Sequence, residues 1–227
     1  MTDVSRETFI VVDVETSHTD PAEGFIFTIG ACVVTYDNEL ATIENEYFYQ
    51  RIDQTTKITD STWLETIYDP KSTLSWWLTQ PLEVQQAAWR GGIERGDMER
   101  DVAHYFWQWV ISMGAKYSEP FDARLKPVFV ANPVTFDYAW ISALFAPYNL
   151  PSPFDYRTLC LRSMGFGVAD GDRWEWVRQK RANQSQVPHH AFWDAYAAAQ
   201  DLQDLLSNRD EQGYHDKLNP KVGEFVA

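Results

Sequence analysis

Two carboxylates lie one residue apart in the segment FIVVDVETSH, residues 9–18. Asp13 and Glu15 follow apolar and β-branched residues that predict a buried strand. Successive side chains of a strand point to opposite faces, so the two carboxylates share one face while Val14 points away. Two carboxylates this close either raise the pKa of one of them or bind a cation. A strand that simply ends in solvent is the plainest alternative.

A second acid follows a later apolar strand, residues 128–131, in the sequence VANPVTFDYAW. Asn132 comes directly after the strand, and a helix over 135–146 is expected next, with Thr135 as its candidate cap. Asp137 falls in the first turn of this helix, where an acid also complements the helix dipole. A catalytic or ligand role and a purely structural role both remain open for it.

A third cluster, PHHAFWDA, opens the clearest helix of the chain, residues 190–206. His189 and His190 lie at its start, where a cap or surface role is the ordinary alternative. Asp194 lies inside the helix among aromatic and alanine neighbours, and a buried aspartate is costly unless it is paired or bound to metal.

The joint occurrence of these clusters, in this order, indicates a metal site. Carboxylate oxygens without cysteine suit hard cations such as Mg²⁺ or Mn²⁺, and Cys32 and Cys160 lack the spacing of a zinc site. Two such ions about 4 Å apart clamp the attacking and leaving oxygens of a phosphodiester. The predicted ligands are Asp13, Glu15, Asp137 and Asp194.

These residues resemble those of the DEDDh 3′-5′ exonucleases, the DnaQ-like branch of the ribonuclease H-like fold that includes oligoribonuclease and ribonuclease T. VVDVETS looks like the first motif of that family, NPVTFDYAWI like the second and HHAFWDA like the third. TLSWWLTQPLEVQQAAW and DYRTL further resemble a bacterial and phage group of exoribonuclease-like proteins within this branch. The resemblance covers about residues 8–206.

The resemblance implies a role for each residue of the site. Asp13, Glu15 and Asp194 would ligate one metal ion, Asp13 would bridge to a second, and Asp137 would complete the site through water. His189 would take a proton from the attacking water, a task that suits an unperturbed pKa near 6.5.

Because two histidines are adjacent, the motif leaves open which of them is the base. Family spacing favours His189 over His190. His189 also falls on the loop before the helix, where it can swing over the metals.

The expected fold is α/β, with a ribonuclease H-like mixed five-stranded sheet flanked by helices. The chain of 227 residues is expected to be one domain with its core at 8–206, an inserted loop at 166–188 and a C-terminal tail at 207–227. An antiparallel meander precedes the helices, and the fourth strand needs a crossover to lie beside the first. Strands are expected at 8–14, 25–37, 42–52, 128–131 and 153–159, and helices at 72–80, 81–90, 97–114 (ended by Gly114), 135–146 and 190–206.

The formal charge of −14 argues against a broad surface that grips long nucleic acid. Single-stranded or short 3′ ends, with RNA favoured by the resemblance, fit a small site where metals neutralise phosphate and aromatic rings stack on bases. Aromatic residues near the motifs could stack or pack in the core: Phe25, Phe27, Trp76, Trp77 and Phe136. The expected substrate contacts are Thr16, Asn132, Phe136, Trp77 and, from a locally basic loop that could equally be plain solvated chain, Arg178, Lys180 and Arg181.

The remaining expectations concern setting and alternatives. No apolar run is long enough to cross a bilayer and no signal peptide is visible, which favours a cytoplasmic protein, or host cytoplasm for a phage protein. The resemblance raises the prospect of a homodimer. The alternative functions are an inactive ribonuclease H-like binding or assembly module and a metal-dependent phosphodiesterase for small nucleotides.

Overall fold

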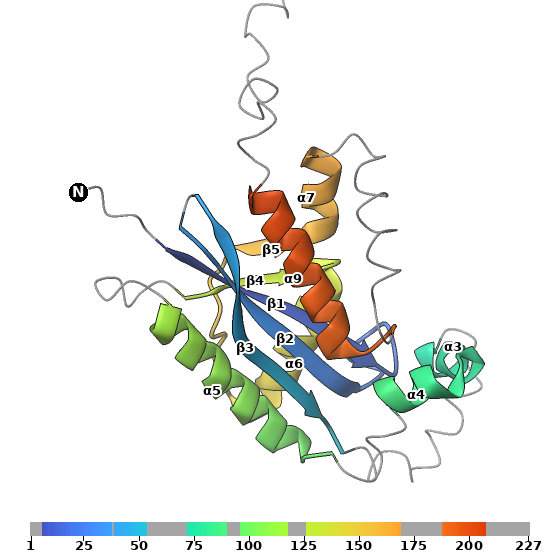
Figure 1. Cartoon of the computed structure of the whole chain (residues 1–227). Coiled ribbons are helices and arrows are strands. Elements are labelled where there is room, and N and C mark those ends of the chain that lie inside the picture. The colour runs from blue at the N-terminus through green and yellow to red at the C-terminus, as the bar shows by residue number, and fades with distance from the viewer. Residues whose placement is uncertain are drawn as a thin grey trace, which may run out of the picture.

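The computed structural model describes residues 6–37, 39–53, 72–89, 96–117, 126–168 and 188–207. Within these residues, five strands form one sheet in the order β3-β2-β1-β4-β5 (Figure 1). The β1-β2 and β2-β3 pairs are antiparallel, whereas β4 is parallel to β1 and to β5. The predicted mixed sheet is confirmed. Its strands are Glu7–Thr16 (β1), Ile26–Tyr36 (β2), Ala41–Arg51 (β3), Val128–Ala131 (β4) and Thr158–Cys160 (β5).

Helices cover both faces of the sheet, with α5 and α6 on one face and α9 across the other (Figure 1). None of the described helices is long and apolar enough to cross a bilayer. The helical elements are Thr73–Thr79 (α3), Leu82–Ala88 (α4), Glu99–Tyr117 (α5), Val134–Phe145 (α6), the 3-10 turn Ala146–Tyr148 (η2), Leu161–Val168 (α7) and Ala191–Ser207 (α9).

The alternation of β1 divides the core in two. Ile10, Val12 and Val14 pack with α5 and α6, while Phe9 and Val11 pack with α9. This is the two-residue period of a strand that is covered on both faces. Positions 13 and 15 continue the row that faces α9, but with carboxylates in place of apolar side chains.

The prediction that Gly114 ends the third long helix is wrong, since α5 continues to Tyr117. A single glycine inside a helix costs only about 1 kcal/mol, which a well-packed helix offsets. A Cβ at Gly114 would lie 3.0 Å from Pro127 Cδ, so the glycine lets the proline pack closely against the helix.

Two other boundaries differ from those expected. Pro133, in an extended conformation, holds the cap position of α6, so Thr135 lies inside the helix and is not its cap. The last strand is shorter than the predicted 153–159 because Asp155 Oδ1 accepts a hydrogen bond from the Arg157 amide at 2.8 Å and closes a turn before β5. The chain then continues into α7, a helix that was not expected, and residues 166–168 of the predicted loop belong to it.

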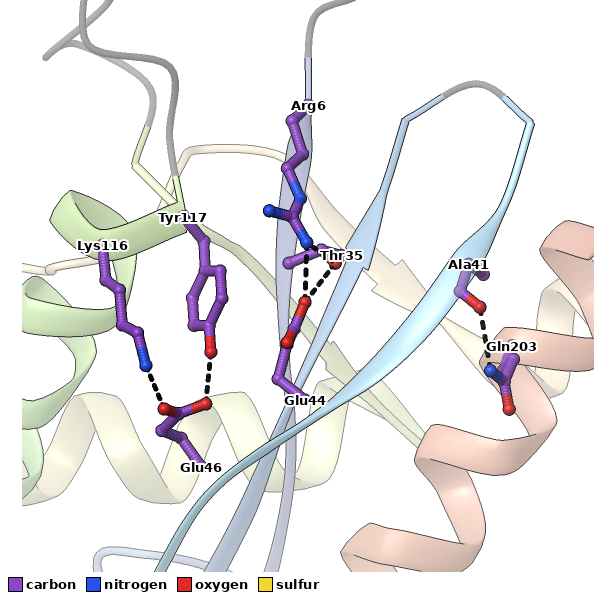
Figure 2. A network of polar contacts seen from close by, with 8 residues as sticks. All are labelled: Arg6, Thr35, Ala41, Glu44, Glu46, Lys116, Tyr117 and Gln203. Atoms are coloured by element: carbon purple, nitrogen blue, oxygen red, sulfur yellow. Dashed lines mark hydrogen bonds and ion pairs between the residues drawn. The ribbon is translucent and has the colours of Figure 1, made fainter.

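The edge strand β3 makes side-chain hydrogen bonds to helices on both faces of the sheet (Figure 2). On the α5 side, Glu46 accepts hydrogen bonds from Lys116 and Tyr117. On the α9 side, Gln203 Nε2 donates to the Ala41 carbonyl at 2.8 Å. These contacts fix an edge strand that would otherwise pair with β2 alone.

Gly30, in the middle of β2, allows α9 to begin directly on the sheet. A Cβ at this position would lie 2.2 Å from the backbone carbonyl of Ala191 and 2.4 Å from the amide of Phe192. No other residue type leaves room for such a backbone contact. Gly30 also pairs with Asp13 across the strands, so the helix begins beside the first carboxylate.

We predict that Gly30→Ala lowers the free energy of unfolding by about 2 kcal/mol, because a methyl group forced against backbone must displace the helix or the strand. Gly114→Ala is the matched control: it adds the same methyl group but gains helix propensity, and should stay within about 1 kcal/mol of wild type. Urea unfolding measures both. Equal stability of Gly30→Ala and wild type would contradict this packing.

Candidate active site

Asp13 and Glu15 lie at the end of β1, on the face that α9 covers. Asp13 is opposite Gly30 and Glu15 is opposite Thr28 in the antiparallel pair. Glu15 is only 8% exposed, although its side chain is an acid. Both carboxylates therefore lie beneath the first residues of α9, as the strand alternation predicts.

Asp137 reaches the same strand end from the other layer. It lies in the first turn of α6 and is 3% exposed. Its Oδ1 accepts a hydrogen bond of 3.0 Å from the amide of Val14, the residue between the two β1 carboxylates. This bond ties the start of α6 to the end of β1.

Asp194 and His189 come from the start of α9. One ligand atom each of Glu15, His189 and Asp194 lie within 4.8 Å of one another, which is close enough to share a metal ion. The backbone amide of His189 donates to the Asp194 carboxylate. His189 itself has a φ of 59°, in the left-handed region that non-glycine residues seldom adopt, so the chain turns sharply just before the helix.

The pKa of each of the four acids is raised, and burial is the largest cause in every case. Burial raises the pKa of Asp13 well above its ordinary value, with further contributions from Glu15, Asp137 and Asp194. The pKa of Glu15 is raised well above its usual range by burial and then by Asp194 and Asp137. Burial raises the pKa of Asp137 to about 7 and that of Asp194 to about 6, although hydrogen bonds from the amides of Val14 and His189 act the other way.

This donor set suits a hard divalent cation. The carboxylates of Glu15 and Asp194 beside the imidazole of His189, with Asp13 and Asp137 close by, offer oxygen-rich coordination of the kind that Mg²⁺ and Mn²⁺ take. A bound cation would also offset the cost of burying these negative charges close together. Among the described residues, no cysteine joins the group, and Cys32 is buried in the apolar core beneath α9.

The two adjacent histidines contact different elements. The ring of His189 packs edge-on against Trp76 and Trp77 of α3, with centroid distances of 5.0 and 5.7 Å. The ring of His190 stacks on Tyr49 of β3 at 4.6 Å. Burial lowers the pKa of both histidines. His189 therefore lies against the acids, while His190 lies against the sheet edge.

The structure gives Trp77 a supporting position. Its side chain is 2% exposed, its Nε1 donates to the Thr16 carbonyl at 3.0 Å, and it packs with Phe25 and Phe27. The predicted stacking of Trp77 on a base does not fit this arrangement, because the ring has no free face. Its neighbour Trp76 is 44% exposed and lies beside His189.

The other expected substrate contacts lie in varied settings. The Thr16 hydroxyl donates to the His18 carbonyl at 2.8 Å and is buried, so it serves the β1-β2 loop. Phe136 is half-buried and Asn132 is exposed beside the start of α6, and for both the substrate contact stays a prediction. Arg178, Lys180 and Arg181 lie outside the described residues.

Sequence reasoning missed Gly30, Tyr49 and Arg51. A glycine inside the apolar run FIFTIGACVV was the signal for close backbone approach. The alternation in TIENEYFYQRI places Tyr49 and Arg51 on one face of β3, and pairing with β2 makes it the face of the acids.

The comparison with protein families matches residues 8–206 to the 3′-5′ exoribonuclease Rv2179c-like domain. This chain belongs to that family. The predicted resemblance to a 3′-5′ exonuclease family is thereby confirmed. The comparison with curated proteins found no match.

Solved structures of E. coli exonuclease I share the fold of this Rv2179c-like domain. The complex with a dA16 oligonucleotide has a TM-score of 0.55 at 14% identity and covers 94% of this chain and 43% of its own. The complex with a dT13 oligonucleotide has a TM-score of 0.56 at 15% identity, with coverages of 93% and 43%. This chain therefore spans less than half the length of exonuclease I.

We predict that Asp194→Asn stabilises the metal-free protein at pH 8. Because the folded-state pKa of Asp194 is raised to about 6, the wild-type carboxyl contributes most stability below its unfolded pKa, near pH 4, and that stability is lost as the pH rises through about 6. The variant should have a Tm about 3–6 °C above wild type at pH 8 in a chelator and equal to it near pH 4.

Saturating Mn²⁺ should reverse this order, because the variant loses a ligand. Asp155→Asn is the control, since the pKa of Asp155 is lowered by Arg157 and its removal should not stabilise the protein at pH 8. A Tm of metal-free Asp194→Asn at or below wild type at pH 8 would contradict the unfavourable burial of this charge.

Proposed function

We propose that the chain is a two-metal-ion 3′-5′ exonuclease that releases nucleoside 5′-monophosphates from the 3′ end of single-stranded or short nucleic acid, with RNA favoured. The observation that carries the proposal is the convergence of four acids and His189 from β1, α6 and the start of α9. The family description as an exoribonuclease supports RNA. The exonuclease I complexes with dA16 and dT13 oligonucleotides support a single-stranded substrate.

Two divalent cations, Mg²⁺ or Mn²⁺, would supply the electrostatic clamp on the attacking and leaving oxygens of the scissile phosphate. Asp13, Glu15 and Asp194 would hold one of them, Asp13 would reach the second, and Asp137 would act through water. A zinc-bound form of the exonuclease I complex with single-stranded DNA supports divalent-ion binding by this fold.

His189 would take the proton of the attacking water. Its pKa is lowered by burial, so the imidazole is neutral and able to accept a proton at neutral pH. Water oxygen then bonds to phosphorus as the bond to the 3′ oxygen of the preceding nucleotide breaks. The product keeps its phosphate on the 5′ oxygen, and the shortened chain ends in a new 3′ hydroxyl.

The remaining parts of the proposal concern the whole protein. A cytoplasmic location, a homodimer and the division into a core of 8–206 with a tail of 207–227 stay predictions. Nearly all of the tail lies outside the described residues.

The proposal predicts stepwise shortening of a 5′-labelled single-stranded oligonucleotide in Mg²⁺ or Mn²⁺, with nucleoside 5′-monophosphates as the second product. Chelator should stop the reaction, and Asp13→Ala should lower its rate by at least about 10³-fold, because both metal ions depend on that carboxylate. Matched RNA and DNA oligonucleotides compare the two substrates. No shortening with either metal would favour the binding module, and cleavage of dinucleotides alone would favour a phosphodiesterase for small nucleotides.

We further predict that His189→Ala lowers kcat by about 10²–10⁴-fold and leaves the Tm within a few degrees of wild type, because it removes a proton acceptor without opening the core. His190→Ala is the control and should keep kcat within about tenfold. Loss of turnover in His190→Ala alone would assign the base to the other histidine.

A further inference from the structure

The sheet carries a cation in the same row as Glu15. The pairings Glu15–Thr28 and Thr28–Arg51 line up three residues across β1, β2 and β3, and the pairings Asp13–Gly30 and Gly30–Tyr49 line up the next row. Residues directly opposite in antiparallel strands point to the same face. Arg51 and Tyr49 therefore lie on the face of the sheet that carries Asp13 and Glu15.

Arg51 is anchored beside the start of α9. Its Nε donates to the Tyr49 hydroxyl at 3.0 Å, and the Tyr49 ring stacks on His190 at 4.6 Å with an interplanar angle of 20°. His190 directly follows His189, so this chain of contacts links the guanidinium to the helix start that carries the acids. Such anchoring reduces the side-chain entropy that a ligand contact would otherwise cost.

Arg51 differs from most cations of the described chain in its partners. Arg6 pairs with Glu44, Lys116 pairs with Glu46, and Arg157 pairs with Asp155 and Glu7. Arg51 is half-buried and makes no ion pair with a carboxylate among the described residues. The hydrogen bond to Tyr49 uses only Nε. The two terminal nitrogens of the guanidinium can therefore still donate to two oxygens of one phosphate.

The position of Arg51 decides which phosphate it can reach. Two strand spacings separate its backbone from that of Glu15, or about 10 Å. The guanidinium is therefore placed for a phosphate beside the one at the carboxylates. On the 3′ side of the scissile bond the terminal nucleotide ends in a hydroxyl, so a neighbouring phosphate exists only on the 5′ side.

We propose that Arg51, held by Tyr49, binds the internucleotide phosphate next to the scissile one on its 5′ side. The inference rests on the proposed function, because it assumes a nucleic-acid 3′ end at the carboxylates. It also explains how a chain with a formal charge of −14 holds a polyanion: one fixed cation acts on one phosphate beside the metal site. Substrates with at least two internucleotide phosphates would be favoured over substrates with one.

The test neutralises one phosphate at a time. A 5′-labelled single-stranded hexanucleotide carries a methylphosphonate at the second linkage from its 3′ end, and the unmodified hexanucleotide is its reference. First-cleavage kcat/KM in Mn²⁺ and binding by fluorescence anisotropy in Ca²⁺ are measured for each variant. Arg100→Gln, which changes an exposed arginine paired with Asp101 at the start of α5, is the matched control.

Wild type and Arg100→Gln should lose about tenfold in kcat/KM and in affinity when the linkage is neutral. Arg51→Gln should already be about tenfold weaker on the unmodified strand and should lose nothing more on the neutral one, whereas Arg51→Lys should keep part of the response. An Arg51→Gln variant that responds to neutralisation as wild type does would overturn the inference. If that variant were also weaker than wild type on each strand by the same factor, the result would indicate a purely structural role through Tyr49.

The two proposals fail in different ways. Shortening of both strands by wild type at equal rates, with equal affinities, would retain the exonuclease and overturn the role of Arg51. A tenfold difference in affinity that depends on Arg51, without shortening of either strand, would support the phosphate contact and refute the exonuclease.

Discussion

The burial of four carboxylates in one place is the constraint on which the site depends. Asp13 and Glu15 are brought together by the two-residue period of a strand, and Asp137 and Asp194 are added from two helices that cover opposite faces of the sheet. Their raised pKa values record the unfavourable free energy of this arrangement. A divalent cation would supply the counter-charge, and its binding would then stabilise the fold.

Backbone packing sets how closely the acids approach. Gly30 lets α9 begin in contact with β2, and the Asp137 hydrogen bond to the Val14 amide fixes α6 to the end of β1. Trp77 of α3 donates a hydrogen bond to the carbonyl of Thr16, the last residue of β1, and so holds this strand end in place. Three separate elements thus position the site, and each of them is a regular helix within the described residues.

Much of this could be predicted from the sequence because it follows from local periodicity. The strand period places Asp13 and Glu15 on one face, and the order of the elements predicts a crossover that brings β4 beside β1. The limits of α5 and of β5 could not be predicted, since they depend on Pro127 packing on Gly114 and on the Asp155 turn, which are tertiary contacts.

The environment of individual side chains could not be predicted from the sequence either. The burial of Trp77 and the exposure of Trp76, its neighbour in the chain, result from how α3 docks on β1 and β2. The separation of His189 from His190 depends on a left-handed backbone conformation at residue 189. The position of Arg51 beside the acids requires the register of three strands.

The most direct test of the central claim is the anomalous diffraction of a crystal soaked in Mn²⁺ at a pH near 8. The account predicts two peaks about 4 Å apart, both within coordination distance of the carboxylates of Asp13, Glu15, Asp137 and Asp194. A crystal that shows no peak among these four residues at saturating Mn²⁺, or ions bound only elsewhere on the acidic surface, would contradict it.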